Sequence, residues 1–154
     1  WNPKNSDRRV LGVDIDIRKH NRDAIEKHPM SSRIEMIEGS SIDSNIIKQV
    51  HSIANGYSKI MLCLDSHHTY AHVLAELNAY AELVSVDSYC IVFDTVVEEM
   101  PVDMFPDRPW EPGDGPKTAV IQFLTENKNF EVDDNYDQKL LLSCCPHGYL
   151  RRIG

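Results

Sequence analysis

The sequence predicts an α/β fold built around a parallel sheet, and three observations support this. Short apolar runs over residues 10–14, 60–65 and 90–94 each end in an aspartate. Segments with helical spacing separate these runs, and this alternation is typical of buried parallel strands. Ligands of such sheets bind just outside the carboxyl ends of the strands. We therefore expect the three aspartates to meet at one crevice, which favours a ligand-binding domain, and an enzyme, over a structural module.

The composition fits one globular domain. With 154 residues, of which 42% are hydrophobic and 26% charged, the chain is long enough to bury a core. Its 24 acidic residues outnumber the 16 Lys and Arg, for a formal net charge of −8. This balance argues against a nucleic-acid partner, because such proteins carry a basic face. No apolar run reaches transmembrane length and no signal peptide is visible, so we expect a cytoplasmic protein without a membrane partner.

The four cysteines predict neither a zinc site nor a disulfide framework. Cys63 and Cys90 lie in predicted strands, and Cys144 and Cys145 are adjacent near the end of another. No CxxC spacing is present, and the composition differs from that of a small disulfide-rich scaffold. We expect buried free thiols in a reducing compartment.

Spacing and turn residues place the other elements. Residues 33–38 predict a second strand. Residues 96–115, which contain four of the eight prolines, predict a long loop over the strand ends that acts as a lid. Residues 140–143 and 149–153 predict two strands joined by a turn into an antiparallel hairpin. Helices are expected over residues 23–28, 44–54, 69–82 and 117–126.

Asp14 and Asp16 follow the first predicted strand. An acid at the end of an early strand in a nucleotide-binding α/β fold accepts hydrogen bonds from two ribose hydroxyls, because a carboxylate offers paired acceptors. A helix N-cap by Asp16, or a solvated turn, is the structural alternative. The strand-end position favours ribose binding for Asp14 and leaves both roles open for Asp16.

Residues 38–43 join a strand to a helix and read Glu-Gly-Ser-Ser-Ile-Asp. Gly39 permits close approach of the backbone, and the Ser and Asp side chains can cap the helix or contact a base. Taken alone, this is a good capping segment. Beside Asp14, it is a candidate for the adenine side of a nucleoside pocket.

Asp65 and Asp94 end neighbouring predicted strands. Two carboxylates in such positions repel unless a cation lies between them, and their oxygens suit Mg²⁺ or Ca²⁺. The alternative is that each acid caps the helix or turn that follows it. Because Thr69 is the better cap for the next helix, we expect Asp65 and Asp94 to bind a metal.

His67, His68 and His72 cluster just after Asp65. His68 and His72 have the i,i+4 spacing of zinc ligands on a helix, but the flanking sequence is not HExxH. A histidine beside a metal can also be a general base, because imidazole titrates near neutral pH. A solvent-facing position is the alternative, favoured for His72 and left open for the other two.

Arg108 and Trp110 lie in the predicted lid. An arginine beside a tryptophan can hold an anionic or ring-shaped ligand by charge and stacking. The same pair can instead order a proline-rich loop, and both interpretations stay open.

An ordered series of motifs resembles the cephalosporin hydroxylase family, which is similar to class I S-adenosylmethionine-dependent methyltransferases and is linked to methylation of antibiotics and sugars. The resemblance covers nearly the whole chain. It implies a Rossmann-like class I methyltransferase sheet with helices on both faces and, here, the C-terminal hairpin. The matching segments are residues 12–18, 37–43, 64–69, 72–74, 93–95, 107–110 and 148–150.

The resemblance also implies roles for matched residues. Asp65 and Asp94 would bind Mg²⁺. The strand-end pattern also resembles that of catechol O-methyltransferases, in which a basic residue three positions after the first aspartate acts as base and a polar residue follows the second. Those positions are His68 and Thr95 here. The cofactor would be held by Asp14 at its ribose, with Asp16 nearby, and by Ser40, Ser41 and Asp43 around its adenine.

The sequence departs from the family pattern in two places, one at the proposed metal site and one at the start of the domain. Some relatives carry an acid immediately before the second aspartate, where this chain has Phe93. Class I methyltransferases also place a glycine-rich loop after their first strand, and this sequence opens at the approach to the second. We therefore expect residues 1–154 to be a single methyltransferase-like domain and a fragment without that strand. Because its absence leaves open strand edges, we expect another segment or a homo-oligomer to cover them.

The sequence thus predicts a Mg²⁺-assisted O-methyltransferase that acts on a hydroxyl of a small molecule or saccharide, with His68 or His67 taking the proton. One alternative is a non-catalytic cofactor-binding or assembly module, and an intact glycine-rich loop upstream would argue against it. Another is a metal-dependent oxygenase or hydrolase that uses Asp65 with a nearby histidine. Bound iron or zinc would favour that second alternative.

Overall fold

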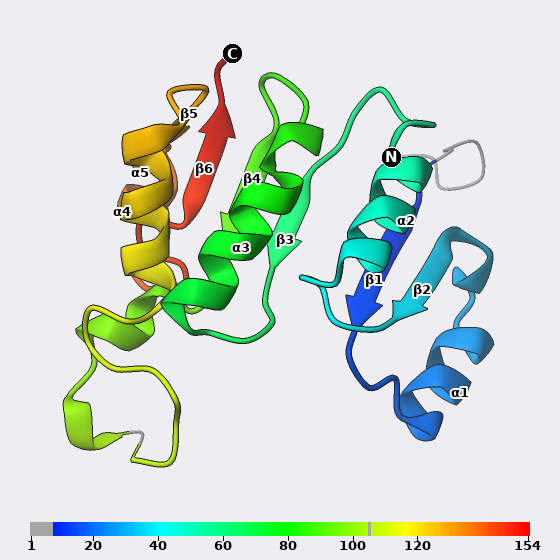
Figure 1. The fold of residues 1–154 in the computed structure, drawn as a ribbon, viewed down its shortest axis with the longest axis horizontal. Helices are drawn as coiled ribbons and strands as arrows, with labels where there is room; N and C mark the ends of the chain where they lie inside the picture. The colour runs from blue at the N-terminus through cyan, green and yellow to red at the C-terminus, as the bar shows by residue number, and fades with distance from the viewer. Residues whose placement is uncertain (1–7, 105) are drawn as a thin grey trace. The chain divides into compact units, whose positions relative to one another are not determined.

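The computed structural model describes residues 8–104 and 106–154 as an α/β protein (Figure 1). The chain divides into two compact units, Trp1–Val50 and His51–Gly154, and each is described by itself. Within those described ranges, no helix combines the length and the apolar character needed to cross a membrane.

The first unit contains a two-stranded parallel sheet. Strands β1 (Val10–Asp14) and β2 (Ile34–Glu38) pair so that Asp14 lies opposite Glu38. This pairing confirms both predicted strands. Each carries branched apolar residues, which favour pleated structure. The helical elements of this part of the chain are α1 (Lys19–Lys27), the 3-10 turn η2 (Ser31–Arg33) and α2 (Ser44–Ala54).

Helix α1 begins earlier than predicted. Its first residue is Lys19 and its N-cap is Arg18, so the proposed capping role of Asp16 is wrong. Lys19 forms an i,i+4 ion pair with Asp23 at 2.6 Å, which supports this added turn although few apolar residues mark it.

The second unit contains a mixed four-stranded sheet in the order β3-β4-β6-β5. Strands β3 (Leu62–Leu64) and β4 (Tyr89–Val92) are parallel. Strand β6 (Tyr149–Arg152) runs antiparallel to both β4 and β5 (Phe130–Val132). The parallel pair at one edge of this sheet brings the ends of β3 and β4 together.

Helices cover both faces of the second sheet. Helices α3 (Tyr70–Tyr80) and α4 (Pro116–Glu126) pack on the face that carries Cys90, Val92 and Leu150. Helix α5 (Asp134–Leu140) lies on the other face, where Tyr136 stacks on Tyr149 with ring centroids 4.8 Å apart. This division follows from the alternation of side chains along β4 and β6.

The predicted hairpin of residues 140–143 with 149–153 is wrong in its first strand. Residue Leu140 ends α5, and Leu141 and Leu142 are 86% and 91% exposed. The partner of β6 is instead β5, whose short Phe-Glu-Val alternation carried too little signal to be noticed. Asp133 accepts a hydrogen bond from the Asn135 N–H and so starts α5 directly after β5.

The expectation of four buried thiols is correct for two of them. All four cysteines are free, with Cys90 and Cys145 buried and Cys63 and Cys144 exposed. Cys63 lies between Leu62 and Leu64 in β3, so its side chain points to the opposite face from theirs.

The predicted lid is a loop interrupted by two 3-10 turns, η4 (Thr95–Glu99) and η5 (Val102–Met104). Its base is held by Glu98, whose carboxylate accepts hydrogen bonds from the N–H groups of Gly113 at 2.9 Å and Thr118 at 2.8 Å. The loop is therefore tied to the start of α4 at a defined point.

Candidate active site

The site is built at the carboxyl ends of β3 and β4. Leu64 of β3 lies opposite Val92 of β4, and the Phe93 N–H donates to the Leu64 carbonyl at 2.9 Å. Asp65 and Asp94 leave the sheet just beyond these pairs. The parallel pairing therefore places both carboxylates at one edge, as the sequence predicts for strands that end together.

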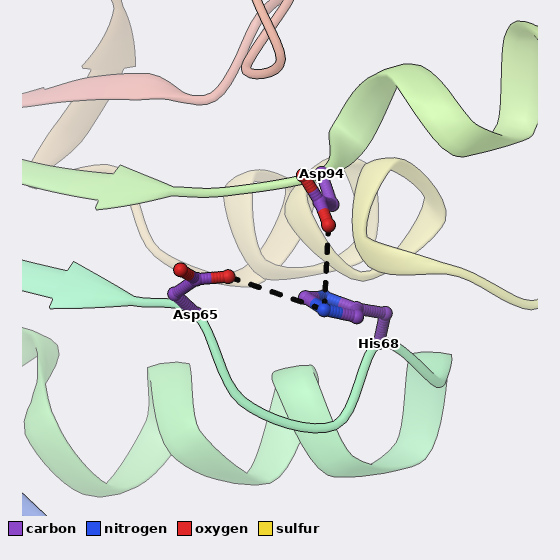
Figure 2. A group of neighbouring side chains, drawn as sticks. All are labelled: Asp65, His68 and Asp94. Atoms are coloured by element: carbon purple, nitrogen blue, oxygen red, sulfur yellow. Dashed lines mark ion pairs between the residues drawn. The ribbon is translucent and has the colours of Figure 1, made fainter. Parts of the chain in front are cut away.

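His68 lies between the two aspartates (Figure 2). Its Nε2 atom is 3.4 Å from Asp94 Oδ2 and 4.0 Å from Asp65 Oδ1. The His68 side chain is 16% exposed, whereas those of Asp65 and Asp94 are 62% and 37% exposed. The imidazole is therefore held against the protein while the carboxylates remain accessible to a ligand.

The donor set of these three residues fits a divalent cation. One ligand atom from each of Asp65, His68 and Asp94 lies within 4.8 Å of the others, which is the separation expected around one ion. The two carboxylates offer oxygen ligands, which favour Mg²⁺ and Mn²⁺. The imidazole offers a nitrogen ligand, which favours Zn²⁺.

Asp94 has an unusual backbone conformation. Its φ of 56° and ψ of 25° lie in the left-handed region, which aspartate and asparagine tolerate better than other residues with a Cβ. Such conformations gather at functional sites, where the surrounding structure holds them. The turn directs the chain from β4 into η4 and leaves the Asp94 carboxylate at the strand end.

The other two histidines face different partners. His67 Nδ1 lies 3.0 Å from Thr69 Oγ1, and His72 Nε2 lies 3.5 Å from Glu76 Oε1. Because α3 starts at Tyr70, His68 precedes the helix and the proposed His68/His72 zinc pair does not form. The solvent-facing role favoured for His72 is also wrong, since its side chain is 18% exposed.

Two buried polar residues lie directly behind the site. Glu76 is 2% exposed and Thr95 is fully buried. Thr95 donates to the Pro146 carbonyl at 2.7 Å, so it anchors the turn after Asp94 and does not point toward a ligand. Sequence reasoning missed Glu76, although a glutamate beside Val73 and Leu77 on the apolar face of a predicted helix was a visible signal.

The lid brings Trp110 to the site. The Trp110 and His68 rings meet edge to face, with centroids 5.4 Å apart and an interplanar angle of 88°. The Arg108 guanidinium carbon lies 5.2 Å from the Trp110 ring centroid. Both residues line a cavity of about 230 Å³ that is walled mainly by apolar and proline side chains from the lid. A surface that combines apolar groups with the charged Arg108 and Glu111 therefore adjoins the Trp110 ring that contacts the imidazole.

In the first unit, the structure brings the remaining predicted residues together. The Gly39 N–H donates to the Asp14 carbonyl at 2.8 Å, so the loop after β2 lies beside the end of β1. Asp14 is exposed, and its Oδ1 accepts from the Asp16 N–H at 3.0 Å. Asp16 is also exposed and lies 3.6 Å from Arg18. The meeting of Asp14 with the strand-end acids of the second unit stays a prediction.

The loop over residues 38–43 has a structural role at its end. Asp43 Oδ1 accepts hydrogen bonds from the N–H groups of Asn45 and Ile46 at 2.8 and 3.3 Å, so Asp43 caps α2. Ser40 and Ser41, which precede this cap in the chain, are half-buried. The capping interpretation is therefore confirmed for Asp43, and one carboxylate oxygen of that residue is committed to the helix.

Comparison with known proteins gives a consistent match. The profile of a family described as Rhamnosyl O-methyltransferase/CmcI matches residues 2–153. Proteins named Rhamnosyl O-methyltransferase from Mycobacterium tuberculosis (strain H37Rv) and Mycobacterium bovis (strain BCG Pasteur) are each 33% identical to this chain over 118 aligned residues. The aligned region covers 75% of this chain and 46% of each relative. The chain therefore spans about half the length of these relatives. No solved structure gave a significant match.

Proposed function

We propose, from the premise that this chain belongs to the Rhamnosyl O-methyltransferase/CmcI family of S-adenosylmethionine-dependent methyltransferases, that its protein methylates a hydroxyl group of a sugar-containing acceptor. The single observation that carries the proposal is the meeting of Asp65, His68 and Asp94 at the carboxyl ends of β3 and β4. This is where ligands of an α/β sheet bind, and these groups suit the activation of a hydroxyl.

The two aspartates are proposed to hold Mg²⁺. Their side chains are accessible and bear charges that oppose each other unless a cation is present. A bound divalent ion supplies Lewis acidity, which lowers the pKa of a hydroxyl group that it contacts. Mg²⁺ prefers the carboxylate oxygens of the two aspartates to the imidazole nitrogen of His68. The imidazole therefore stays available for proton transfer.

His68 is proposed as the general base. Its Nε2 atom faces the two carboxylates, and its ring is held by the edge-to-face contact with Trp110. A base so placed would accept the proton of the acceptor hydroxyl. S-adenosylmethionine, when bound, would supply the methyl group and leave as S-adenosylhomocysteine. Positioning of the two reactants supplies much of the rate in such a transfer. His67, with its ring directed to Thr69, is the second candidate.

The acceptor is proposed to lie against the lid. The relatives are named for a rhamnosyl group, and a sugar presents C–H groups that pack on an indole face. Trp110 provides such a face beside His68, and Arg108 adds a cation for polar groups of the acceptor. The cavity that both residues line has a volume of about 230 Å³, enough for one sugar ring.

The cofactor is proposed to bind at the end of β1. Asp14 would accept hydrogen bonds from the ribose hydroxyls, as acids in this position do in nucleotide-binding sheets. Asp16, Ser40, Ser41 and Asp43 would border the adenine. The contact between Gly39 and Asp14 supports this grouping, because it places the loop beside the strand end.

Calorimetric titration of S-adenosylhomocysteine into the protein with its native N-terminus restored, with and without Mg²⁺, tests the proposal. We expect saturable binding that weakens at least about tenfold when Asp14 is replaced by Ala, because the paired ribose hydrogen bonds are lost. Asp23→Ala is the matched control, since Asp23 is a surface carboxylate of the same unit that pairs with Lys19. Absence of binding by the unaltered protein under either condition would contradict the proposal and favour a non-catalytic module.

Self-association remains a separate proposal. Within each described unit, β1 and β3 each pair with one strand, and unpaired strand edges favour further pairing. Light scattering over a range of protein concentrations measures the mass directly. A concentration-independent monomer mass would contradict the proposed homo-oligomer.

A further inference from the structure

Glu76 is a carboxylate in the apolar core of the second unit. It lies on α3 between Val73 and Leu77, and it is 2% exposed. Burying a charge costs free energy unless the charge is paired or hydrogen-bonded. A leucine in the same position would fill the space without this cost, so packing alone does not account for a glutamate.

The partners of Glu76 belong to the candidate active site. Ser66 Oγ lies 2.8 Å from both carboxylate oxygens of Glu76, and His72 Nε2 lies 3.5 Å from Oε1. Ser66 directly follows Asp65 and stands two residues before His68. The hydrogen bond therefore ties the loop that carries both of these groups to the rigid body of α3.

The loop after β4 is anchored in a parallel way. Thr95 directly follows Asp94, is fully buried, and donates to the Pro146 carbonyl at 2.7 Å. Glu76 and Thr95 are the two buried polar residues within the described part of the chain. Glu76 therefore secures Ser66, the residue directly after Asp65, and Thr95, the residue directly after Asp94, is itself secured to the Pro146 carbonyl.

We propose that Glu76 is a positioning residue, which holds Ser66 and thereby keeps Asp65 and His68 in register with Asp94. The inference rests on the proposed metal-binding role of that site. Glu76 acts through Ser66 and not on the reacting groups, in the way that hydrogen-bonded partners behind metal ligands orient them. Loss of such partners typically weakens metal affinity by about 10- to 100-fold.

The test measures Mn²⁺ binding by electron paramagnetic resonance, because Mn²⁺ suits the same oxygen ligands as Mg²⁺. Ser66→Ala removes the donor from an exposed residue, and we expect it to raise the Mn²⁺ dissociation constant about tenfold or more. Glu76→Gln keeps an amide oxygen that accepts from Ser66, so its loss should be smaller. Glu82→Gln is the matched control, because the side chain of Glu82 is 74% exposed.

The double variant shows whether Ser66 and Glu76 affect Mn²⁺ affinity through one shared hydrogen bond or independently. If Ser66 and Glu76 act as a pair, S66A/E76Q binds Mn²⁺ no more weakly than S66A. Losses that multiply, or an S66A affinity equal to that of the control, would overturn the inference while leaving the proposed metal site intact. If the unaltered protein itself binds no Mn²⁺, the metal site of the proposed function fails and the inference fails with it. Should E76Q not fold, S66A alone decides.

Discussion

His68 Nε2 lies 3.4 Å from Asp94 Oδ2, although the two residues follow different strands of the sheet. The loop after β3 bends away from β4 and then returns to His68, whose imidazole points toward that carboxylate (Figure 2). His68 is the histidine of its cluster that meets both Asp65 and Asp94. A proton acceptor and a cation-binding pair are therefore neighbours at one edge of the sheet, and this relationship leads to the first two predictions.

Asp94→Asn should abolish metal-dependent turnover and leave the fold intact. Asparagine tolerates the left-handed backbone of residue 94 as aspartate does, but its amide lacks the charge that holds the cation. We expect turnover at saturating Mg²⁺ to fall by about 100-fold or more, as measured by methyl transfer across a Mg²⁺ titration. Asp23→Asn, on the surface of α1, should behave as the unaltered protein does. Undiminished turnover of D94N would remove the metal role.

His68→Asn should lower kcat far more than His67→Asn does. General-base catalysis contributes about 10²- to 10⁴-fold, and only the His68 ring faces the carboxylates, since His67 contacts Thr69. The two variants are matched in chemistry and are adjacent in sequence. The measurement is kcat as a function of pH, in which the ionisation of the base should disappear from the H68N profile. A larger loss in H67N would reassign the base to His67.

Trp110→Ala should weaken acceptor binding without a comparable loss of cofactor binding. Aromatic contacts contribute about 0.5–1.5 kcal/mol beyond area burial, which corresponds to a rise of about 2- to 10-fold in the KM for the acceptor. Trp110→Phe retains a ring beside His68, so its KM for the acceptor should lie between those of the unaltered protein and W110A. The control is Met104→Ala, because Met104 is a 51% exposed lid residue outside the cavity lining. An unchanged KM in W110A would place the acceptor elsewhere.

The Tyr89–Asp133 hydrogen bond should make stability depend on pH at both ends of the scale. Tyr89 Oη donates to Asp133 Oδ2 at 2.8 Å. The bond raises the pKa of Tyr89 to about 12 and holds the pKa of Asp133 below its usual value. A lowered carboxyl pKa stabilises the fold above the unfolded-state pKa of about 3.9, and a raised phenol pKa does so below about 10.

Tyr89→Phe should therefore be less stable than the unaltered protein between these two pH values. The difference should fade as the pH falls through the lowered pKa of Asp133, and again as it rises toward about 12, the raised pKa of Tyr89. Urea unfolding across this range measures it, with the 42% exposed Tyr57→Phe as control. A difference that does not change with pH would assign the effect to packing against Tyr136 instead.

Leu150→Ala and Leu142→Ala should differ widely in stability. Leu150 is fully buried in β6, whereas Leu142 is 91% exposed. Truncation of a buried leucine costs about 2–5 kcal/mol, and surface substitutions usually change stability by less than about 0.5 kcal/mol. Urea unfolding of both variants gives the comparison. Similar large losses would mean that residues 140–143 are packed after all, as the sequence pattern had suggested.

Local patterns predicted most of the elements. The helix over residues 69–82 is one example, because Val73, Leu77 and Tyr80 recur at helical spacing and are buried in α3. The strands ending before Asp65 and Asp94 are others. Failures came where the signal was equally local but ambiguous, as in the leucine run at residues 140–142, which suits a strand interior as well as an exposed helix end.

The sequence by itself determined that Asp65 and Asp94 share a sheet edge, because parallel strands that are adjacent must end on the same side. Only the tertiary structure decided which histidine joins them, since the path of the loop from Asp65 to Thr69 brings His68 to the two carboxylates. It also decided that Trp110 packs on His68 and that Thr95 points into the core. These contacts join residues far apart in the chain, and no periodicity within a single segment encodes them.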